Sequence, residues 1–499
     1  MIGKFFRIKL TDQVKDSHVQ RGLLALLYEG VCSQLMDTLT SGAFLVAFAL
    51  LMGASNTVIG LLAAVSPLTQ LLQLPAIYLV DRTSTRKTLV VLTSLLSRVS
   101  WLIVAIIPWL VPSHQQVDVL LICLFLYFGL GTISACGFNP WIRDFVPEKI
   151  MGRYFGKRMA IGTAAGSVLA LLAGVGIELG NRYVPSHFVP YSALFLLGGI
   201  VGLSGVYFLS QVPEPRVTKQ KPEGILKSLG QPFRDLNFRR LLIFLGILFI
   251  AINLSGPFYA VYMIKRLDMS MALVIGLAVL SQIMSVISFR VWGKAADSFT
   301  NKSVLIVSGY IYIISVLLWP FLLLSGSYFY RIPLLVVVHM LTGISAAGVN
   351  LCTANIALKS APRGKATAFL GVNTLVHGVT AAAAPIVGGI IADRLTGDHL
   401  ASIQHWLTTN IGAFFDLAFS HFLGLHSLFI LTAIIGLYAM HSLRAVHERG
   451  EVEGRIVVAH LLEEGRKAVR HVFTSGGIRH LSRSPSASAE ENASTSQAQ

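Results

Sequence analysis

Two acidic side chains stand within an apolar stretch near the start of the sequence. The stretch runs from 22 to 52 and contains Glu29 and Asp37. On a helix, at about 100° per residue, both fall on the same half of the surface as Gln34 and several hydroxyl side chains. An ionised carboxylate is costly in an apolar environment, so an acid there is typical of a proton carrier or an ion pair. Asp37, near the middle of the stretch, is therefore the first candidate for proton coupling.

Three further apolar stretches carry polar stripes with i, i+3/i+4, i+7 spacing. A polar helix face cannot meet lipid cheaply, so each stripe should line a cavity or bond to a neighbouring helix. Both interpretations stay open for the hydroxyl and amide groups, and His377 is either a cavity residue or a packed neutral histidine. The stripes comprise Ser66, Thr69, Gln70 and Gln73; Ser281, Gln282, Ser285 and Ser288; and Asn373, Thr374, His377 and Thr380.

One cation also lies deep within an apolar stretch. Arg98 is about ten residues into the stretch 88–111, and Glu29 lies at a similar depth in its own stretch. Because an unpaired charge in a membrane is costly, we expect a structural Glu29–Arg98 ion pair. A direct contact between Arg98 and a substrate is the alternative.

The composition places these residues in a membrane protein. Hydrophobic residues make up 54% of the 499 residues and charged residues only 13%, against about 25% charged in soluble domains. Spans of about 20 apolar residues must be helical, because backbone groups in lipid are paired internally. The sequence predicts an all-α polytopic membrane protein with twelve spans. These are 22–52, 56–80, 88–111, 117–140, 158–179, 190–211, 240–264, 272–293, 303–325, 332–357, 366–391 and 425–445.

The basic residues set the orientation of these spans. Of the 40 Lys and Arg residues, 33 fall in segments on one side of the membrane and 5 in segments on the other. The positive-inside rule then predicts a multi-pass protein of the cytoplasmic (inner) membrane with both termini in the cytoplasm. The net charge of +16 is thus an orientation signal, and we expect no nucleic-acid partner.

The sequence repeats internally at nearly one offset. Ser41-Gly42-Ala43-Phe44 recurs as Ser255-Gly256-Pro257-Phe258, and two further short segments recur in the same order. This indicates two homologous six-span halves that run the same way through the membrane. The predicted domains are a bundle at 1–211, a cytoplasmic linker at 212–239, a second bundle at 240–445, and an amphipathic helix with a disordered tail at 446–499.

Short loops after the second and eighth spans point to a family. The first reads Asp81-Arg82-Thr83-Ser84-Thr85-Arg86-Lys87, and the second reads Gly293-Lys294-Ala295-Ala296-Asp297, followed by Lys302. They resemble the loop signature of the major facilitator superfamily, a Gly-x-x-x-Asp before a short basic turn, although the first copy has Ile77 at the glycine position. The segment from Pro147 to Arg158 looks like an inner loop of bacterial members. The resemblance covers about 20–445.

The resemblance implies two six-helix bundles that rock about a central site. The first, second, fourth and fifth spans of each half would line the cavity, which agrees with the polar stripes. The loop acids would pair with basic residues in one state only, and Asp81 could cap the span at 366–391. The alternative is that these are ordinary positive-inside loop charges. The gating candidates are Asp81, Arg82, Arg86, Arg143, Asp144, Asp297 and Lys302.

These features together predict a secondary active transporter for a small solute, with protons as the candidate coupling ion. No GxxxxGK[ST] motif for ATP hydrolysis occurs in the sequence. We expect a monomer that needs no cofactor or metal and is not an enzyme. The alternatives are a membrane-embedded lipid-handling enzyme and a non-transporting sensor that reuses the fold. The enzyme is disfavoured, because Glu29 and Asp37 are the only acidic pair within a span.

Overall fold

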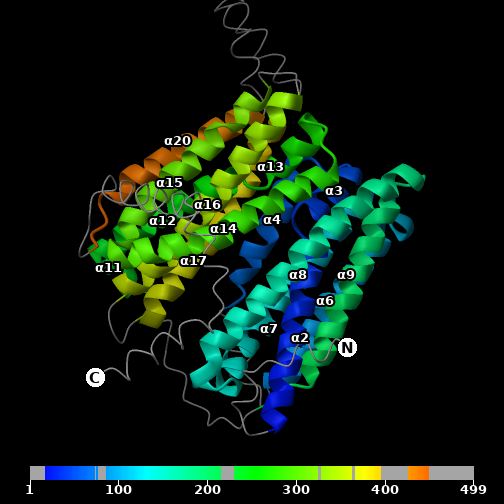
Figure 1. Ribbon diagram of the computed structural model, residues 1–499, viewed down its shortest axis with the longest axis horizontal. Coiled ribbons are helices and arrows are strands. Elements are labelled where there is room, and N and C mark those ends of the chain that lie inside the picture. The colour runs from blue at the N-terminus through cyan, green and yellow to red at the C-terminus, as the bar shows by residue number, and fades with distance from the viewer. Residues whose placement is uncertain are drawn as a thin grey trace, which may run out of the picture.

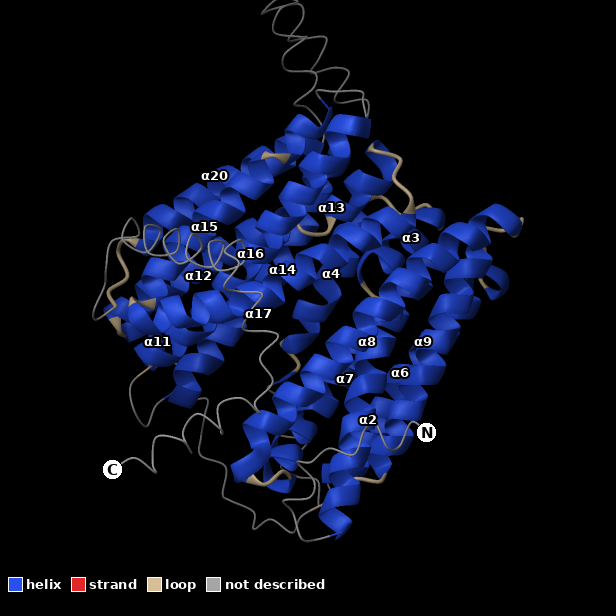
Figure 2. Cartoon of the chain, viewed as in Figure 1, coloured by secondary structure: helices blue, strands red, loops and turns tan. Residues whose placement is uncertain are grey.

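The computed structural model describes residues 17–73, 75–76, 86–214, 230–323, 328–361, 366–394 and 425–448. Within these ranges the chain is helical and contains no strand (Figure 1, Figure 2). Eleven of the described helical segments are long and apolar enough to cross a membrane. Together with the shorter α4 (Asn56–Gln70), they correspond to the twelve predicted spans. The protein is an all-α polytopic membrane protein.

The first half begins with a broken span. α2 (Ser17–Thr40) and α3 (Gly42–Leu51) are separated at Ser41, and Gly42 has a φ of 61°, a conformation that glycine adopts without strain. α4 then precedes four long helices. These are α6 (Arg86–Leu110), α7 (Gln116–Phe145), α8 (Glu148–Tyr183) and α9 (Phe188–Ser210), with the short η2 (Ser113–Gln115) before α7.

The second half repeats this pattern. α12 (Leu236–Ser255) ends at the serine that repeats Ser41, so the recurring sequence marks the break in the first span of each half. The short α11 (Gln231–Arg234) precedes it, and α13 (Phe258–Val261) and η3 (Tyr262–Arg266) complete the span. The remaining elements are α14 (Met271–Ser298), α15 (Asn301–Leu317), η4 (Trp319–Leu323), α16 (Tyr328–Ser360), α17 (Ala366–Arg394) and α20 (Leu425–Leu443).

Within each half, helices that are distant in sequence pack together. α2 packs against α8 and α9, and α12 packs against α17 and α20. The two halves meet mainly through α4 with α17 and α8 with α14. In Figure 1 the blue-to-cyan helices and the green-to-orange helices converge near α3, α4 and α13 and diverge toward the end where α2 begins.

Small residues bring α4 and α17 very close. A Cβ added at Gly60 would collide with the backbone oxygen of Pro385, and one at Gly389 would collide with the backbone of Asn56. Beside them, the Asp393 carboxylate accepts hydrogen bonds from the backbone N–H groups of Asn56 at 2.9 Å and Thr57 at 2.7 Å. The last turn of α17 therefore caps the first turn of α4, across the boundary between the halves.

The segment after α20 packs back onto the second half. Glu448 accepts hydrogen bonds from the Lys302 backbone N–H at 2.7 Å and from the Asn301 side chain at 2.8 Å, which caps the start of α15. The rest of the predicted amphipathic helix and tail, and most of the predicted linker, lie outside the described residues. The predicted domain boundaries stay predictions.

Candidate functional site

A cavity of about 560 Å³ lies among the helices of the first half. Its lining comes from α2, α4, α6, α7, α8 and α9, and its volume is typical of small-molecule sites. Among the residues that the structure describes, the charged ones in its lining are Glu29, Asp37, Arg98 and Arg158. The geometry of these four groups defines what the cavity can do.

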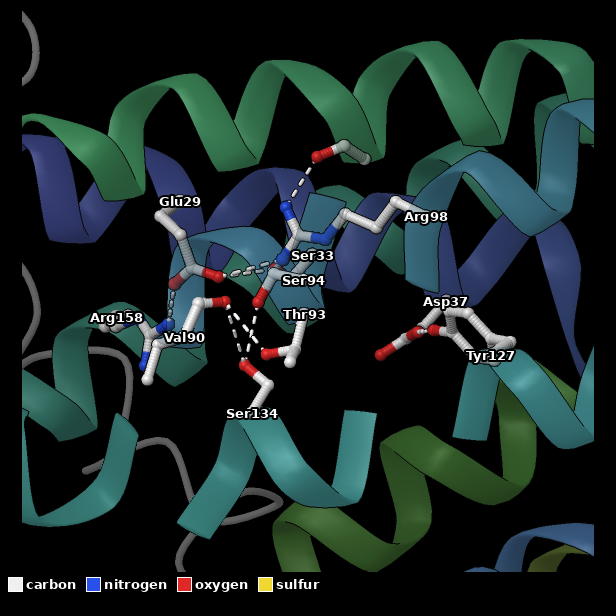
Figure 3. Close-up of polar contacts among 11 residues, drawn as sticks. Glu29, Ser33, Asp37, Val90, Thr93, Ser94, Arg98, Tyr127, Ser134 and Arg158 are labelled. Carbon is white, nitrogen blue, oxygen red and sulfur yellow. Dashed lines mark hydrogen bonds and ion pairs between the residues drawn. The ribbon is translucent and has the colours of Figure 1, made fainter. Parts of the chain in front are cut away.

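Arg98 is fixed on three sides at one end of the cavity (Figure 3). Its Nη2 donates to Glu29 Oε1 at 3.1 Å and to Ser33 Oγ at 2.7 Å, and its Nη1 donates to the Gly202 backbone oxygen at 2.5 Å. A Cβ on Gly205 would approach Nη1 within 2.6 Å, so glycines on α9 make room for the guanidinium. The Glu29–Arg98 contact expected from the sequence is present, and Arg98 is 7% exposed.

A second arginine shares the same carboxylate. Arg158 Nη2, from α8, donates to Glu29 Oε2 at 2.5 Å, and its guanidinium lies 5.9 Å from the centre of the Phe138 ring. The side chain passes over Gly30, where any Cβ would collide with it. Glu29 therefore bridges arginines from two helices, α6 and α8.

Sequence reasoning missed the role of Arg158 because it placed the residue at the junction between an inner loop and the predicted span. α8 begins at Glu148, ten residues before the predicted span, so Arg158 is helical. A signal was available in its spacing, since Arg158, Gly162 and Gly166 lie four residues apart and share one helix face. All three meet α2, whose contacting residues Gly30, Gln34 and Thr38 have the same spacing.

Asp37 faces the cavity in a different environment. Tyr127 on α7 donates its hydroxyl to Asp37 Oδ1 at 2.9 Å, and the tyrosine ring packs edge-on against Trp101 at 5.2 Å. The Asp37 residue is exposed to the cavity space. None of the ion pairs within the described part of the chain includes it. Asp37 therefore has a hydrogen-bond donor but no paired cation in the described part of the chain.

Hydroxyl groups line the wall between these two acids. Ser94 and Ser134 share a hydrogen bond of 2.7 Å, and Ser97 donates to the Tyr127 backbone oxygen at 2.8 Å. These bonds join α6 to α7 and keep uncharged polar groups at the cavity surface. The predicted cavity residues Gln70 and Gln73, from α4 and the turn after it, line the same space.

The other predicted cavity residues lie elsewhere. Gln34 packs against Gly162 and Gly166 on α8, and Gln282 is exposed on α14. Neither is among the lining residues of the cavity. Asn373 and His377 line a second cavity of about 170 Å³ in the other half, where the His377 ring stands perpendicular to Phe249 at 4.3 Å.

The described gating candidates differ in their surroundings. Arg86 pairs with Asp144 at 3.1 Å, joining α6 to α7, and the Lys302 ammonium donates to the Val446 backbone oxygen at 2.8 Å. Arg143 and Asp297 are exposed. Asp81 and Arg82 lie outside the described residues. A gating role for this set stays a prediction.

A polar cavity inside a bundle of apolar spanning helices fits a membrane transporter. The sequence matches the model of the Major Facilitator Superfamily over residues 30–385, and the chain belongs to this family. It is therefore a multi-pass membrane protein and a secondary transporter.

Solved structures share this fold at low sequence identity. The crystal structure of the nucleoside transporter NupG is 13% identical, with a TM-score of 0.64 over 86% of this chain and 99% of that chain. A bacterial homolog to the human lysosomal transporter Spinster, inward-facing and unoccupied, is 15% identical, with a TM-score of 0.61 over 87% of this chain and 98% of that chain. A D-xylose-proton symporter is 13% identical, with a TM-score of 0.58 over 88% and 99%. A comparison with curated proteins finds no match.

Proposed function

We propose that this transporter moves a small solute by alternating access, with Asp37 as the carboxyl that couples transport to protons. One observation carries the proposal: Asp37 faces the cavity, bonded to Tyr127 and unpaired with any cation in the described residues. Such a carboxyl can take up and release a proton without breaking an ion pair. Glu29 is paired with two arginines, so a proton could bind to it only if an ion pair were broken.

The contacts between the halves support an assignment of state. The Asp393 cap and the Gly60 and Gly389 contacts lie where α4 begins and α17 ends. With both termini in the cytoplasm, as the basic residues predict, this end is the outer one. The structure then corresponds to an inward-facing state of a protein in the cytoplasmic membrane. The relative of Spinster that shares the fold is also described as inward-facing.

Protonation would control the change of state through desolvation. While the cavity is open, water can solvate the ionised carboxylate of Asp37. Closing the cavity removes that water, which disfavours the charged form. Protonation of Asp37 in the solute-loaded cavity therefore permits the closed state, and the proton gradient biases the equilibrium between the two openings.

The test uses purified protein in proteoliposomes. A thermal-shift screen against metabolite panels first identifies a solute, and its uptake is then driven by an imposed pH gradient. Asp37→Asn should abolish gradient-driven accumulation and leave downhill exchange of the solute. Asp118→Asn, which changes an exposed carboxylate in the first turn of α7, is the matched control. Gradient-driven uptake by Asp37→Asn equal to that of the unmutated protein would remove Asp37 from the mechanism.

A further inference from the structure

The charged cluster at one end of the cavity carries more positive than negative charge. Two guanidinium groups, from Arg98 and Arg158, share the single carboxylate of Glu29. The Arg98 and Glu29 side chains are 8% and 6% exposed, and that of Arg158 is 18% exposed. A net charge held away from bulk water is unfavourable unless another charge balances it.

Asp37 is the one remaining charged group among the described lining residues. With Asp37 ionised, the four charged groups of the cavity sum to zero. With Asp37 protonated, they sum to one positive charge. The groups near Asp37 do not alter this count, because Tyr127 from α7 is neutral and the α4 lining residues are serine, threonine and glutamine.

The two arginines differ in how firmly they are held. Arg98 has three hydrogen-bond acceptors, from α2 and α9. Arg158 has one ion pair, made by Nη2, and among the described residues its Nη1 has no acceptor, whereas its Nε is buried against Gly30. Its guanidinium is also the more exposed of the two and lines the cavity beside Phe138. Arg158 is therefore the cation with donor capacity left for a ligand.

We propose that the cavity binds a small organic monoanion, a carboxylate or sulfonate, and that Arg158 recognises it by sharing its guanidinium between Glu29 and the oxygens of the ligand. Guanidinium groups match the planar oxygen pair of such anions. This substrate class rests on the proposed function of Asp37. The charge of the anion replaces the charge that Asp37 loses on protonation, so the loaded cavity is neutral when it closes.

The charge of the cavity can be measured at a native residue. Cys136 on α7 lines the cavity and is a free cysteine. Replacing Cys32, Cys123 and Cys352 with alanine leaves it as the sole reactive site. The purified full-length protein is labelled with an anionic reagent, 2-sulfonatoethyl methanethiosulfonate, and with a cationic one, 2-(trimethylammonium)ethyl methanethiosulfonate. Each rate is divided by the rate of the same reagent with free 2-mercaptoethanol.

The expected result is a normalised preference for the anionic reagent at acidic pH, where Asp37 is protonated. Arg158→Gln should reduce this preference on the order of tenfold, the effect of one unit charge across a small cavity of intermediate dielectric. Arg158→Lys should keep it. Arg182→Gln, an exposed arginine at the far end of the same helix, is the matched control and should also keep it. Equal rates for the two reagents, or an unchanged preference in Arg158→Gln, overturn the proposal.

Two further measurements keep the proposal testable if Arg158→Gln does not fold. Asp37→Asn mimics the protonated acid and should show the anionic preference at neutral pH as well. Benzoate should slow labelling of Cys136 by neutral N-ethylmaleimide, whereas its isosteres benzamide and benzylammonium should not. Protection by benzamide equal to that by benzoate, or no protection by benzoate, overturns the proposal.

Labelling needs neither a gradient nor turnover, so this inference and the proposed function fail separately. An anionic preference, together with normal gradient-driven uptake by Asp37→Asn, would refute proton coupling alone. Loss of gradient-driven uptake in Asp37→Asn without any charge preference would refute the anionic substrate class alone.

Discussion

The carboxylate of Asp393 on α17 accepts the backbone N–H of Thr57 on α4 at 2.7 Å, which joins the two halves of the protein by a helix cap. The same carboxylate accepts the N–H of Asn56 at 2.9 Å. An acid at a helix N-terminus satisfies donors that lack an intrahelical partner and meets the positive end of the helix dipole. For the halves to separate at this end, both bonds must break.

Asp393→Asn should therefore favour the state in which this end is open. An amide has one acceptor oxygen and no charge, so the cap weakens by about 1 kcal/mol, a several-fold change in population. Arg182 and Lys265 are exposed positions of opposite halves near this end. In an otherwise cysteine-free protein, spin labels are attached at Arg182→Cys and Lys265→Cys. Pulsed electron paramagnetic resonance then measures the distance between the two labels. The longer distance should gain population, and Asp118→Asn should leave the distribution unchanged. An unaltered distribution in Asp393→Asn would show that the cap does not hold the halves together.

Gly60→Ala tests the close approach of α4 and α17 by sterics alone. The added Cβ would collide with the Pro385 backbone oxygen, which cannot move aside as a side chain can. We expect loss of the closed contact and at least a tenfold lower transport rate, because one arm of the alternating cycle is blocked. Gly276→Ala on α14 is the control, since nothing lies within 4 Å of its added Cβ. Equal transport by both variants would mean that the helices separate easily at Gly60.

The two arginines of the cavity should differ in their contribution to stability. Arg98→Leu leaves the Glu29 carboxylate with one cation and removes the side-chain donor from the Gly202 oxygen, and removing one partner of a buried ion pair costs about 3–5 kcal/mol. Arg158→Leu removes one bond from a more exposed side chain and should cost less. Thermal unfolding of the purified variants measures both, and Arg98→Leu should have the lower Tm. The reverse order would contradict the structural role given to Arg98.

Hydrophobic windows predicted the twelve spans, because composition alone decides which segments can enter a membrane. They could not predict Arg158 or Asp393. Each lies near the end of an apolar stretch, on a helix that continues beyond that stretch. A hydropathy window assigns such helix ends to loops. The Glu29–Arg98 contact could be anticipated from matching depth in two spans. The contact of Glu29 with a second arginine depends on how α8 packs against Gly30. The depth of a residue in its span does not predict which helix packs beside it.

Tyr127→Phe tests the environment of Asp37 through the pH dependence of uptake. The tyrosine hydroxyl donates to the carboxylate and so stabilises its ionised form. Without that donor the protonated form is favoured, and the pH at half-maximal gradient-driven uptake should move upward. A pH series in proteoliposomes measures the midpoint, and Tyr183→Phe, an exposed tyrosine at the end of α8, should leave it in place. A midpoint that moves downward or does not move would contradict the assignment of Tyr127 as the partner of the coupling acid.

Truncation at two neighbouring positions separates the role of the C-terminal segment from that of α15. A chain ending at Glu448 keeps the carboxylate that caps Asn301 and Lys302, whereas one ending at Ala445 loses it, together with the Val446 oxygen bonded to the Lys302 ammonium. The loss of a cap and of a partner for a buried cation should lower the stability of the shorter chain by about 2–4 kcal/mol. Because the longer chain retains every contact that the structure describes for this segment, we expect its thermal stability and uptake to equal those of the full protein. Normal uptake by the longer chain would also show that residues 449–499 are not needed for transport, and lost uptake at normal stability would instead favour a regulatory tail.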